Sequence, residues 1–135
     1  MKPLIITNNS KVYDEFSAKV EIVYGEDLSQ EEILKMARDR IHLGAKLVIH
    51  PMMGRIKPHE TPYKSVFLEV PDEREITDGS FTTDMTSVTI IEDSIAETAK
   101  LIHNTYRQKY DEQLLSDLSY IDFILIKSGI EEYGK

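Results

Sequence analysis

The first half of the chain alternates between short apolar runs and segments whose apolar residues recur at helical spacing. Residues 3–7 form an apolar run typical of a buried strand, and the polar residues 8–10 suit a turn and the start of a helix. Residues 20–24 predict a second strand that ends at Gly25. This succession of strand, helix and strand is typical of an α/β unit.

The most clearly marked helix of the sequence follows Ser29. Ser29 and Glu32 have the spacing of a capping box, in which each side chain accepts a hydrogen bond from the backbone N–H of the other residue. Apolar residues continue at helical spacing from Ile33 to Ile41, and Gly44 suits the left-handed backbone that often ends a helix. The pattern therefore predicts a helix between Ser29 and Gly44.

Three more apolar runs predict strands. They cover residues 46–49, 65–70 and 86–91, and the last of them is rich in β-branched residues, which favour strands. Between the second and third of these runs, residues 71–75 predict an exposed acidic turn. The sequence thus predicts about five strands in all.

The C-terminal part of the sequence predicts two helices. Ser94 and Glu97 repeat the capping-box spacing at the start of a long amphipathic segment. Apolar residues within residues 114–125 predict a final helix that stops at Gly129, although residues 116–128 also fit a strand. The type of this last element therefore stays open.

The order of these elements predicts a three-layer α/β/α sandwich, flavodoxin-like or Rossmann-like, whose mixed but mainly parallel sheet has about five strands. No linker interrupts the sequence, so residues 1–135 are expected to form a single α/β domain. If the first three strands lie in the order 2-1-3, residues 7–10 lie beside His50 at the carboxyl edge of the sheet. Ligands of open α/β sheets bind at such an edge.

Residues 50–65 are the most unusual segment of the sequence, because they form a long connection with neither helical nor strand periodicity. Connections of this length are uncommon in compact domains and are usually functional or disordered. The prolines of this segment restrict the chain, and its apolar residues can anchor it. A functional loop is therefore the favoured interpretation.

The charge of this loop differs from that of the whole chain. The formal net charge of the chain is −8, which argues against general binding to nucleic acid. Residues 50–65 instead contain three basic residues and one acidic residue, together with two histidines. A basic loop on an acidic body favours a small anionic ligand or an acidic partner segment. The alternative is a solvated loop whose charges only keep the protein soluble.

Together, the end of the first strand and the long loop predict a ligand site. Amide and hydroxyl groups at a helix N-terminus would contact the ligand, and Arg55, Lys57 and Lys64 would supply charge. The Walker phosphate loop and the dinucleotide fingerprint are both absent from the sequence. The predicted ligand-binding residues are Asn8, Asn9, Ser10, His50, Gly54, Arg55, Lys57, His59, Glu60, Thr61, Tyr63 and Lys64.

Two other function classes fit the same sequence. In a small enzyme, His50 or His59 would transfer a proton and Glu60 would orient the histidine. In a protein-interaction module, the loop or a long amphipathic helix would dock onto a larger protein or onto a second copy of the chain. No metal site is predicted, because the spacing of the histidines matches no known ligand pattern.

The composition narrows the chemistry and the compartment. The chain has no cysteine and therefore cannot itself perform thiol redox chemistry. Residues 1–6 are too short for a secretory signal, and no apolar run approaches the length that spans a membrane. We therefore expect a cytoplasmic protein that does not contact membranes.

Two stretches of the sequence also carry a family resemblance. Ile6-Thr7-Asn8-Asn9 and the segment from His50-Pro51 to Lys64-Ser65 resemble the GrdX family, as does the size of the chain. These small proteins are named because their genes accompany those for glycine, sarcosine or betaine reductase in amino-acid-fermenting bacteria. The resemblance implies an accessory role near reductive amino-acid metabolism, with a reductase component as a partner. It identifies neither a cofactor nor a catalytic residue, so both stay unknown.

Overall fold

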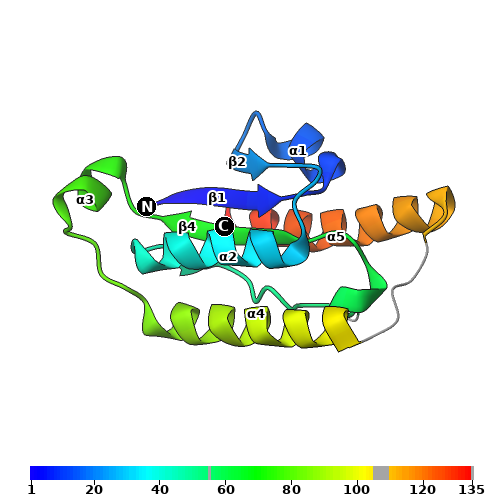
Figure 1. Cartoon of the computed structure of the whole chain (residues 1–135). Coiled ribbons are helices and arrows are strands. Elements are labelled where there is room, and N and C mark those ends of the chain that lie inside the picture. The colour runs from blue at the N-terminus through cyan, green and yellow to red at the C-terminus, as the bar shows by residue number, and fades with distance from the viewer. Residues whose placement is uncertain (55, 105–109, 135) are drawn as a thin grey trace.

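Figure 1 shows the computed structural model of the chain, which describes residues 1–54, 56–104 and 110–134. Within these ranges one sheet contains β1 (Lys2–Thr7), β2 (Glu21–Tyr24), β3 (Lys46–Leu47) and β4 (Ser65–Val70). The helices are α1 (Ser10–Phe16), α2 (Gln30–His42), α3 (Glu73–Asp78), α4 (Met85–Asn104) and α5 (Glu112–Tyr133). A short 3-10 helix, η1, covers Pro58–Glu60.

The sheet is mixed, with the strand order β2-β1-β4-β3. β1 pairs with β2 in parallel, whereas β4 runs antiparallel to both of its neighbours, β1 and β3. The prediction of a mainly parallel, flavodoxin-like or Rossmann-like sheet of about five strands is therefore wrong, as is the order 2-1-3. The physical reason is that the long loop reverses the chain, so β4 enters the sheet between β1 and β3.

Residues 86–91 do not form the predicted fifth strand, because they lie within α4. Asp84 favours the helix start, since its carboxylate accepts hydrogen bonds from the N–H of Ser87 at 3.1 Å and from the Ser87 hydroxyl at 2.6 Å. Ile91 is buried in the core, and Ile95, one helical turn later, packs against the same core. Burial of this helical face overrides the strand preference of the β-branched residues.

Two local predictions around these elements are also wrong. Ser94 does not cap a helix, because it lies inside α4 and its hydroxyl donates to the carbonyl of Ile90 at 2.8 Å. Residues 71–75 are not only an acidic turn, because α3 begins within them after Asp72. Serine and aspartate can cap a helix, but they also occur in turns and inside helices. Their spacing alone therefore does not predict where a helix begins.

The final element is a helix, which settles the open choice for residues 116–128. Gly129 does not stop it, contrary to the prediction, because α5 continues to Tyr133. Gly129 is buried, and a Cβ atom at this position would lie 3.4 Å from side-chain atoms of Ile49 and of Phe67. This glycine therefore permits close packing of α5 on the sheet.

The predicted helix after Ser29 is confirmed as α2. Both hydrogen bonds of the capping box are present, and each joins Ser29 and Glu32 at 3.1 Å. Gly44 follows the helix with a φ angle of 96°, and a Cβ atom there would lie 2.7 Å from the Cβ of Phe81. The end of α2 therefore requires glycine for its backbone conformation and for its packing.

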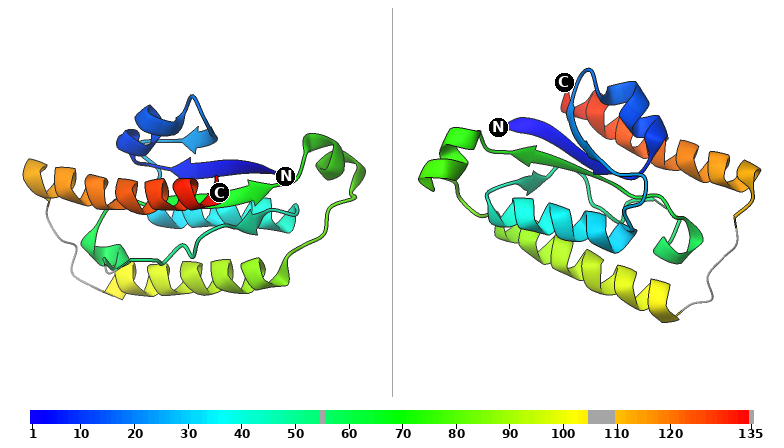
Figure 2. Two further views of the ribbon diagram at one scale, coloured as in Figure 1. Left: turned by 180° about the vertical axis from the view of Figure 1, so that it is seen from behind. Right: turned by 45° about the horizontal axis from the view of Figure 1, so that its top comes forward.

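Helices cover both faces of the sheet (Figures 1 and 2). On one face, Ile41 of α2 and Leu4 of β1 belong to the same buried cluster, and α4 packs against α2. On the other face, Ile126 of α5 joins Ile5 and Phe67 of the sheet in a second cluster, together with residues of α1. None of the helices in the described ranges is long and apolar enough to cross a membrane.

Candidate functional site

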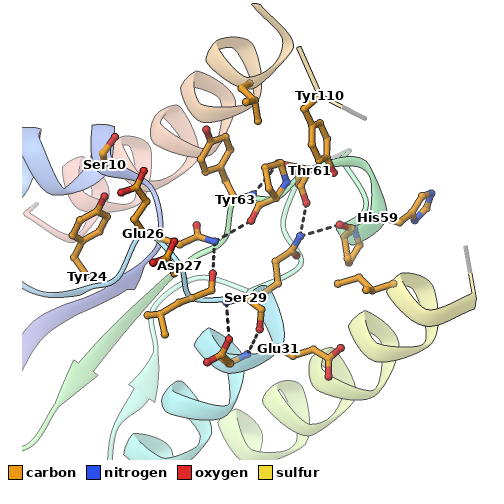
Figure 3. A pocket seen from close by; sticks show the side chains of 18 of the residues that line it. Ser10, Tyr24, Glu26, Asp27, Ser29, Glu31, His59, Thr61, Tyr63 and Tyr110 are labelled. Atoms are coloured by element: carbon orange, nitrogen blue, oxygen red, sulfur yellow. Dashed lines mark hydrogen bonds between the residues drawn. The ribbon is translucent and has the colours of Figure 1, made fainter. Parts of the chain in front are cut away.

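A pocket with a volume of about 950 Å³ lies beside the carboxyl ends of β1 and β2 (Figure 3). Its walls come from the β1–α1 turn, the β2–α2 loop, the first turns of α2, the region of η1, and the ends of α4 and α5 that face it. Segments far apart in the sequence thus meet around one opening. Two buried amide side chains, Asn8 and Gln30, hold these segments together.

Asn8 follows β1 and joins two loops at the edge of the pocket. Its Nδ2 donates hydrogen bonds to the backbone carbonyls of Leu28 and Pro62, both at 2.9 Å. Its Oδ1 accepts a hydrogen bond from the backbone N–H of Lys64, also at 2.9 Å. All three partners are backbone groups, so the side chain of Asn8 fixes the course of the β2–α2 loop and of the loop that leads into β4.

Gln30, the first residue of α2, holds the same loop from the opposite side. Its Nε2 donates to the carbonyls of Pro58 at 2.8 Å and Thr61 at 2.5 Å. These two acceptors fix the orientation of the amide, because only its nitrogen can donate to them. The Oε1 atom has no hydrogen-bond partner among the described residues, although Gln30 is only 4% exposed. The wall of the pocket therefore contains an unsatisfied acceptor.

The charged side chains that line the pocket are mostly acidic. Carboxylates of Glu26, Asp27, Glu31 and Glu32 line it, whereas Lys35 supplies the one ammonium group among the described lining residues. Glu26 and Asp27 are exposed and belong to the β2–α2 loop. The electrostatic character of the pocket thus differs from that of the basic loop that the sequence singled out.

Tyrosine side chains also line the pocket, and Figure 3 labels Tyr24, Tyr63 and Tyr110. Burial raises the pKa of the Tyr63 phenol above its ordinary value, and the nearby charge of Glu26 raises it further. Burial and the charge of Glu26 also raise the pKa of the Tyr24 phenol. Both phenols are therefore neutral at physiological pH and offer aromatic surface and a hydroxyl group.

The structure brings some of the predicted site residues to the pocket and leaves others away from it. Those that line it are Asn8, Ser10, His59, Thr61 and Tyr63. Those that do not line it are Asn9, His50, Gly54, Lys57, Glu60 and Lys64. Arg55 lies outside the described residues. The polar part of the predicted site is thus represented in the pocket, whereas its described basic residues are not.

Two of the three groups considered for proton transfer, His50 and Glu60, form hydrogen bonds within their own loop. His50 Nδ1 accepts a hydrogen bond from the N–H of Met52 at 3.0 Å, and Glu60 accepts one from the N–H of Lys57 at 2.9 Å. His59 Nδ1 is buried and has no partner among the described residues. In the part of the chain that the structure describes, no group of three or more His, Cys, Asp or Glu side chains is arranged to hold a metal ion.

Asn9, which the sequence also placed in the site, belongs to a buried polar network beneath α5. It caps α1, because its Oδ1 accepts from the N–H of Lys11 at 3.1 Å. The same Oδ1 accepts from the Ser119 hydroxyl at 2.7 Å, while Nδ2 donates to the Ser119 carbonyl at 2.9 Å and to Asp122 Oδ2 at 3.0 Å. Asn9 therefore joins α1 to α5.

Asp122 is the charged member of this network. Its Oδ2 also accepts a hydrogen bond from the Ser65 hydroxyl at 2.7 Å, and Ser65 lies 2.6 Å from the hydroxyl of Thr7. Burial raises the pKa of the Asp122 carboxyl, although the hydrogen bonds from Asn9 and Ser65 and the charge of Lys64 act in the opposite direction. The network thus holds a carboxyl group that is poorly solvated.

Lys64, predicted to give charge to a ligand, instead serves the loop. Its Nζ donates a hydrogen bond to the carbonyl of Pro51 at 2.7 Å. Burial lowers the pKa of the Lys64 ammonium group, and the charge of Asp122 partly offsets this effect. The side chain therefore connects the two ends of the long loop near Asp122.

Sequence reasoning missed several residues of these two regions. Glu26, Asp27 and Gln30 follow β2, the parallel neighbour of β1, and the rule that placed residues 8–10 at the carboxyl edge applies to them equally. Their position after a strand could therefore have identified them from the sequence. Asp122 gave no such signal, because its partner Asn9 is 113 residues away in the sequence.

The fold and the pocket define a small α/β protein with a polar pocket at the carboxyl ends of two parallel strands. The chain belongs to the GrdX-like family, because the model of that family, described as GrdX-like protein, matches residues 4–131. This match confirms the resemblance seen in the sequence and covers nearly the whole chain. No curated protein and no solved structure matches the chain.

Proposed function

We propose that this GrdX-like protein is an accessory protein of reductive amino-acid metabolism that binds a small ligand in the pocket beside β1 and β2. The metabolic setting is the one that the family implies. The volume of about 950 Å³ supports a small ligand, because pockets for such ligands usually measure about 300–1,000 Å³.

The observation that carries the proposal is the way in which the pocket wall is held. Asn8 and Gln30 are both buried, and they direct their side chains to backbone groups of the loops that form the wall. Such bonds reduce the freedom of the loops before any ligand arrives. A preformed wall lowers the entropy that is lost on binding.

The sequence predicts a small anionic ligand, and this remains one of the ligand classes to be tested. Lys57 and Lys64 are described but do not line the pocket, so the structure gives an anion less support than the sequence does. A ligand screen should therefore contain amines, zwitterionic amino acids, carboxylates and phosphates in equal number.

Thermal unfolding in the presence of these compounds tests the proposal. A ligand that binds only the folded protein adds about 2.7 kcal/mol of stability at 100 times its dissociation constant, so a true ligand should raise the melting temperature in a saturable way. Lys35→Trp, which places an indole at the pocket, should remove the shift. Lys100→Trp, an exposed lysine on α4 outside the pocket, is the matched control and should retain it.

Two results would reject ligand binding at this pocket. One is that no compound of the four classes stabilises the protein. The other is that a compound stabilises the protein and the Lys35→Trp variant equally.

One observation favours a second function, that of a module which docks onto a reductase component. Tyr120, Ile121 and Ile124 lie on α5 and are 53%, 41% and 43% exposed. Neighbouring exposed apolar side chains are typical of protein-interaction surfaces. Sedimentation of the protein mixed with a purified reductase component should show a complex that Ile121→Glu weakens. Equal sedimentation of the wild type and the variant in this mixture would remove this alternative.

A further inference from the structure

We infer that the pocket beside β1 and β2 takes a small organic cation with a protonated amine that carries N–H groups. This inference rests on the proposed function and names the ligand class of the same site. The charges of the pocket, an unsatisfied acceptor in its wall and its aromatic surface support it, and each is an independent property of the described residues.

The charges of the lining residues favour a cation over an anion. Among the lining residues that the structure describes, Glu26, Asp27, Glu31 and Glu32 bring four carboxylates to the pocket and Lys35 brings one ammonium group, so the formal charge of these five side chains is −3. Opposite charges that lie a few ångströms apart attract each other even in bulk water, and more strongly where water is displaced. Several carboxylates around one opening therefore attract a cation and repel an anion.

The described lysines of the long loop do not reverse this balance. Lys57 is exposed and does not line the pocket. Lys64 directs its Nζ to the carbonyl of Pro51, and its ammonium group lies close enough to Asp122 for their charges to interact. Of these two lysines, one therefore forms a hydrogen bond within the loop and the other faces solvent.

The second observation is the unsatisfied Oε1 atom of Gln30. Gln30 lines the pocket, is only 4% exposed, and directs its Nε2 to the carbonyls of Pro58 and Thr61. Oε1 is therefore an acceptor that needs a donor, and a protonated amine supplies N–H donors, whereas a carboxylate or phosphate dianion supplies none. Oε1 is closed to water, so we expect a ligand to reach it through a local displacement of Pro58 and Thr61, while the hydrogen bonds of Asn8 keep the rest of the wall in place.

The third observation is the aromatic surface of the pocket. The rings of Tyr24 and Tyr63 line it, and Tyr63 is close enough to Glu26 for that carboxylate to affect its phenol. A cation over the face of a tyrosine ring is attracted by the negative charge density of that face. Carboxylates and aromatic rings at one opening suit an organic cation better than a bare metal ion.

A set of probes of similar shape separates charge from hydrogen bonding. tert-Butylammonium carries a charge and N–H donors, tert-butanol has the same shape without the charge, and tetramethylammonium has the charge without N–H donors. Titrations of the ¹⁵N-labelled protein at constant ionic strength and pH 7.5 should give the tightest binding for tert-butylammonium. We expect it to bind about tenfold more tightly than tert-butanol and severalfold more tightly than tetramethylammonium. The amide signal of Thr61 should move with tert-butylammonium.

A pair of double variants tests the role of the carboxylates. Glu26→Gln combined with Asp27→Asn should weaken the binding of tert-butylammonium about fivefold. Glu92→Gln combined with Asp93→Asn is the matched control, because these two residues are also adjacent and exposed but do not line the pocket. This control should bind the probe as the wild type does.

Different failures point to different parts of the account. If tert-butanol or acetate binds as tightly as tert-butylammonium, or if both double variants bind the probe alike, the inference about a protonated amine is overturned while the pocket remains a ligand site. If tetramethylammonium equals tert-butylammonium, the role given to Gln30 Oε1 is overturned. If none of these probes and no compound of the wider screen binds, the proposed function fails as well.

Discussion

Asn8 and Asn9 are neighbours in the sequence, yet they lead into two regions of opposite character. The side chain of Asn8 bonds only to backbone groups of surrounding loops, and the pocket beside it stays open (Figure 3). The side chain of Asn9 bonds to the backbone of its own helix and to Ser119 and Asp122 of α5, and it is fully buried. One asparagine thus shapes a cavity, whereas the other closes an interface.

The comparison shows how one turn can contribute both to an open pocket and to a closed interface between helices. Side chains of consecutive residues after a strand point to different sides, so the β1–α1 turn can serve both regions at once. If this division is correct, a substitution of Asn9 should lower the free energy of unfolding more than a substitution of Asn8, and only the substitution of Asn8 should disturb the pocket. The following predictions test that difference.

The largest effect is expected for Asn9→Ala. This substitution removes the cap of α1 and takes one of the two hydrogen-bond donors from the Asp122 carboxylate, whose other donor is the Ser65 hydroxyl. It also leaves the buried Ser119 hydroxyl without its acceptor. Loss of a cap costs about 1 kcal/mol, and loss of a hydrogen bond to a charged group costs about 1.5–3 kcal/mol. The free energy of unfolding, measured in urea, should therefore fall by about 3–5 kcal/mol. A loss below about 1 kcal/mol would show that the network does not hold α5.

A smaller effect on stability is expected for Asn8→Ala, because its partners are backbone groups nearer to the surface. The free energy of unfolding should fall by about 2 kcal/mol, and amide exchange in residues 58–64 should become faster than in the wild type. Asn9→Ala is the comparison variant and should speed exchange mainly in α1 and α5. Equal exchange in residues 58–64 for both variants would contradict the division between the two regions.

Lys64→Met tests the structural role given to this lysine. The variant keeps a long side chain and loses the hydrogen bond to Pro51, so the free energy of unfolding should fall by about 1 kcal/mol. Lys57→Met, an exposed lysine of the same loop, should change it by less than about 0.5 kcal/mol. A loss no larger than that of Lys57→Met would mean that Lys64 is free to serve a ligand, as the sequence suggests.

Asp122→Asn should change stability least near pH 4, because asparagine keeps the shape of the side chain and an acceptor oxygen. The informative quantity is the pH dependence. Since burial raises the pKa of Asp122 in the folded protein, the folded state retains its proton at a higher pH than the unfolded state. The wild type should therefore lose stability relative to Asp122→Asn as the pH rises above about 4, the ordinary pKa of aspartate. Urea unfolding between pH 4 and pH 7 measures the free energy of unfolding of both proteins. If the advantage of Asp122→Asn over the wild type stays constant or shrinks as the pH rises, the prediction is contradicted.

Helix caps and glycines in the sequence predicted an element correctly where no other preference competed with them. The capping box at Ser29 and the glycine at position 44 marked both ends of α2. They failed where a local preference competed with burial, as in residues 86–91, whose β-branched residues suit a strand although their apolar face is buried in a helix. The direction of β4 could not be predicted, because a long irregular loop can return the chain in either direction.

The lining of the pocket agrees only in part with the binding residues that the sequence predicts. The end of a strand and an unusual loop are visible in the sequence, and they led to Asn8, Thr61 and Tyr63. Glu26 and Asp27 also follow the end of a strand. We interpreted their short loop only as the connection to the helix that Ser29 caps. Charge counted along the sequence does not say where each charge lies in the fold. Of the described lysines of the basic loop, Lys57 is exposed and Lys64 donates a hydrogen bond to Pro51.

The most direct test of the account is an NMR map of where a ligand from the screen contacts the protein. Binding should move the amide and side-chain signals of Asn8, Gln30 and Tyr63, and it should leave those of Asn9 and Ser119 nearly unchanged. Changes that gather around Asn9 and α5, or that are absent from the pocket while binding is saturable, would contradict the claim that the pocket beside β1 and β2 is the binding site.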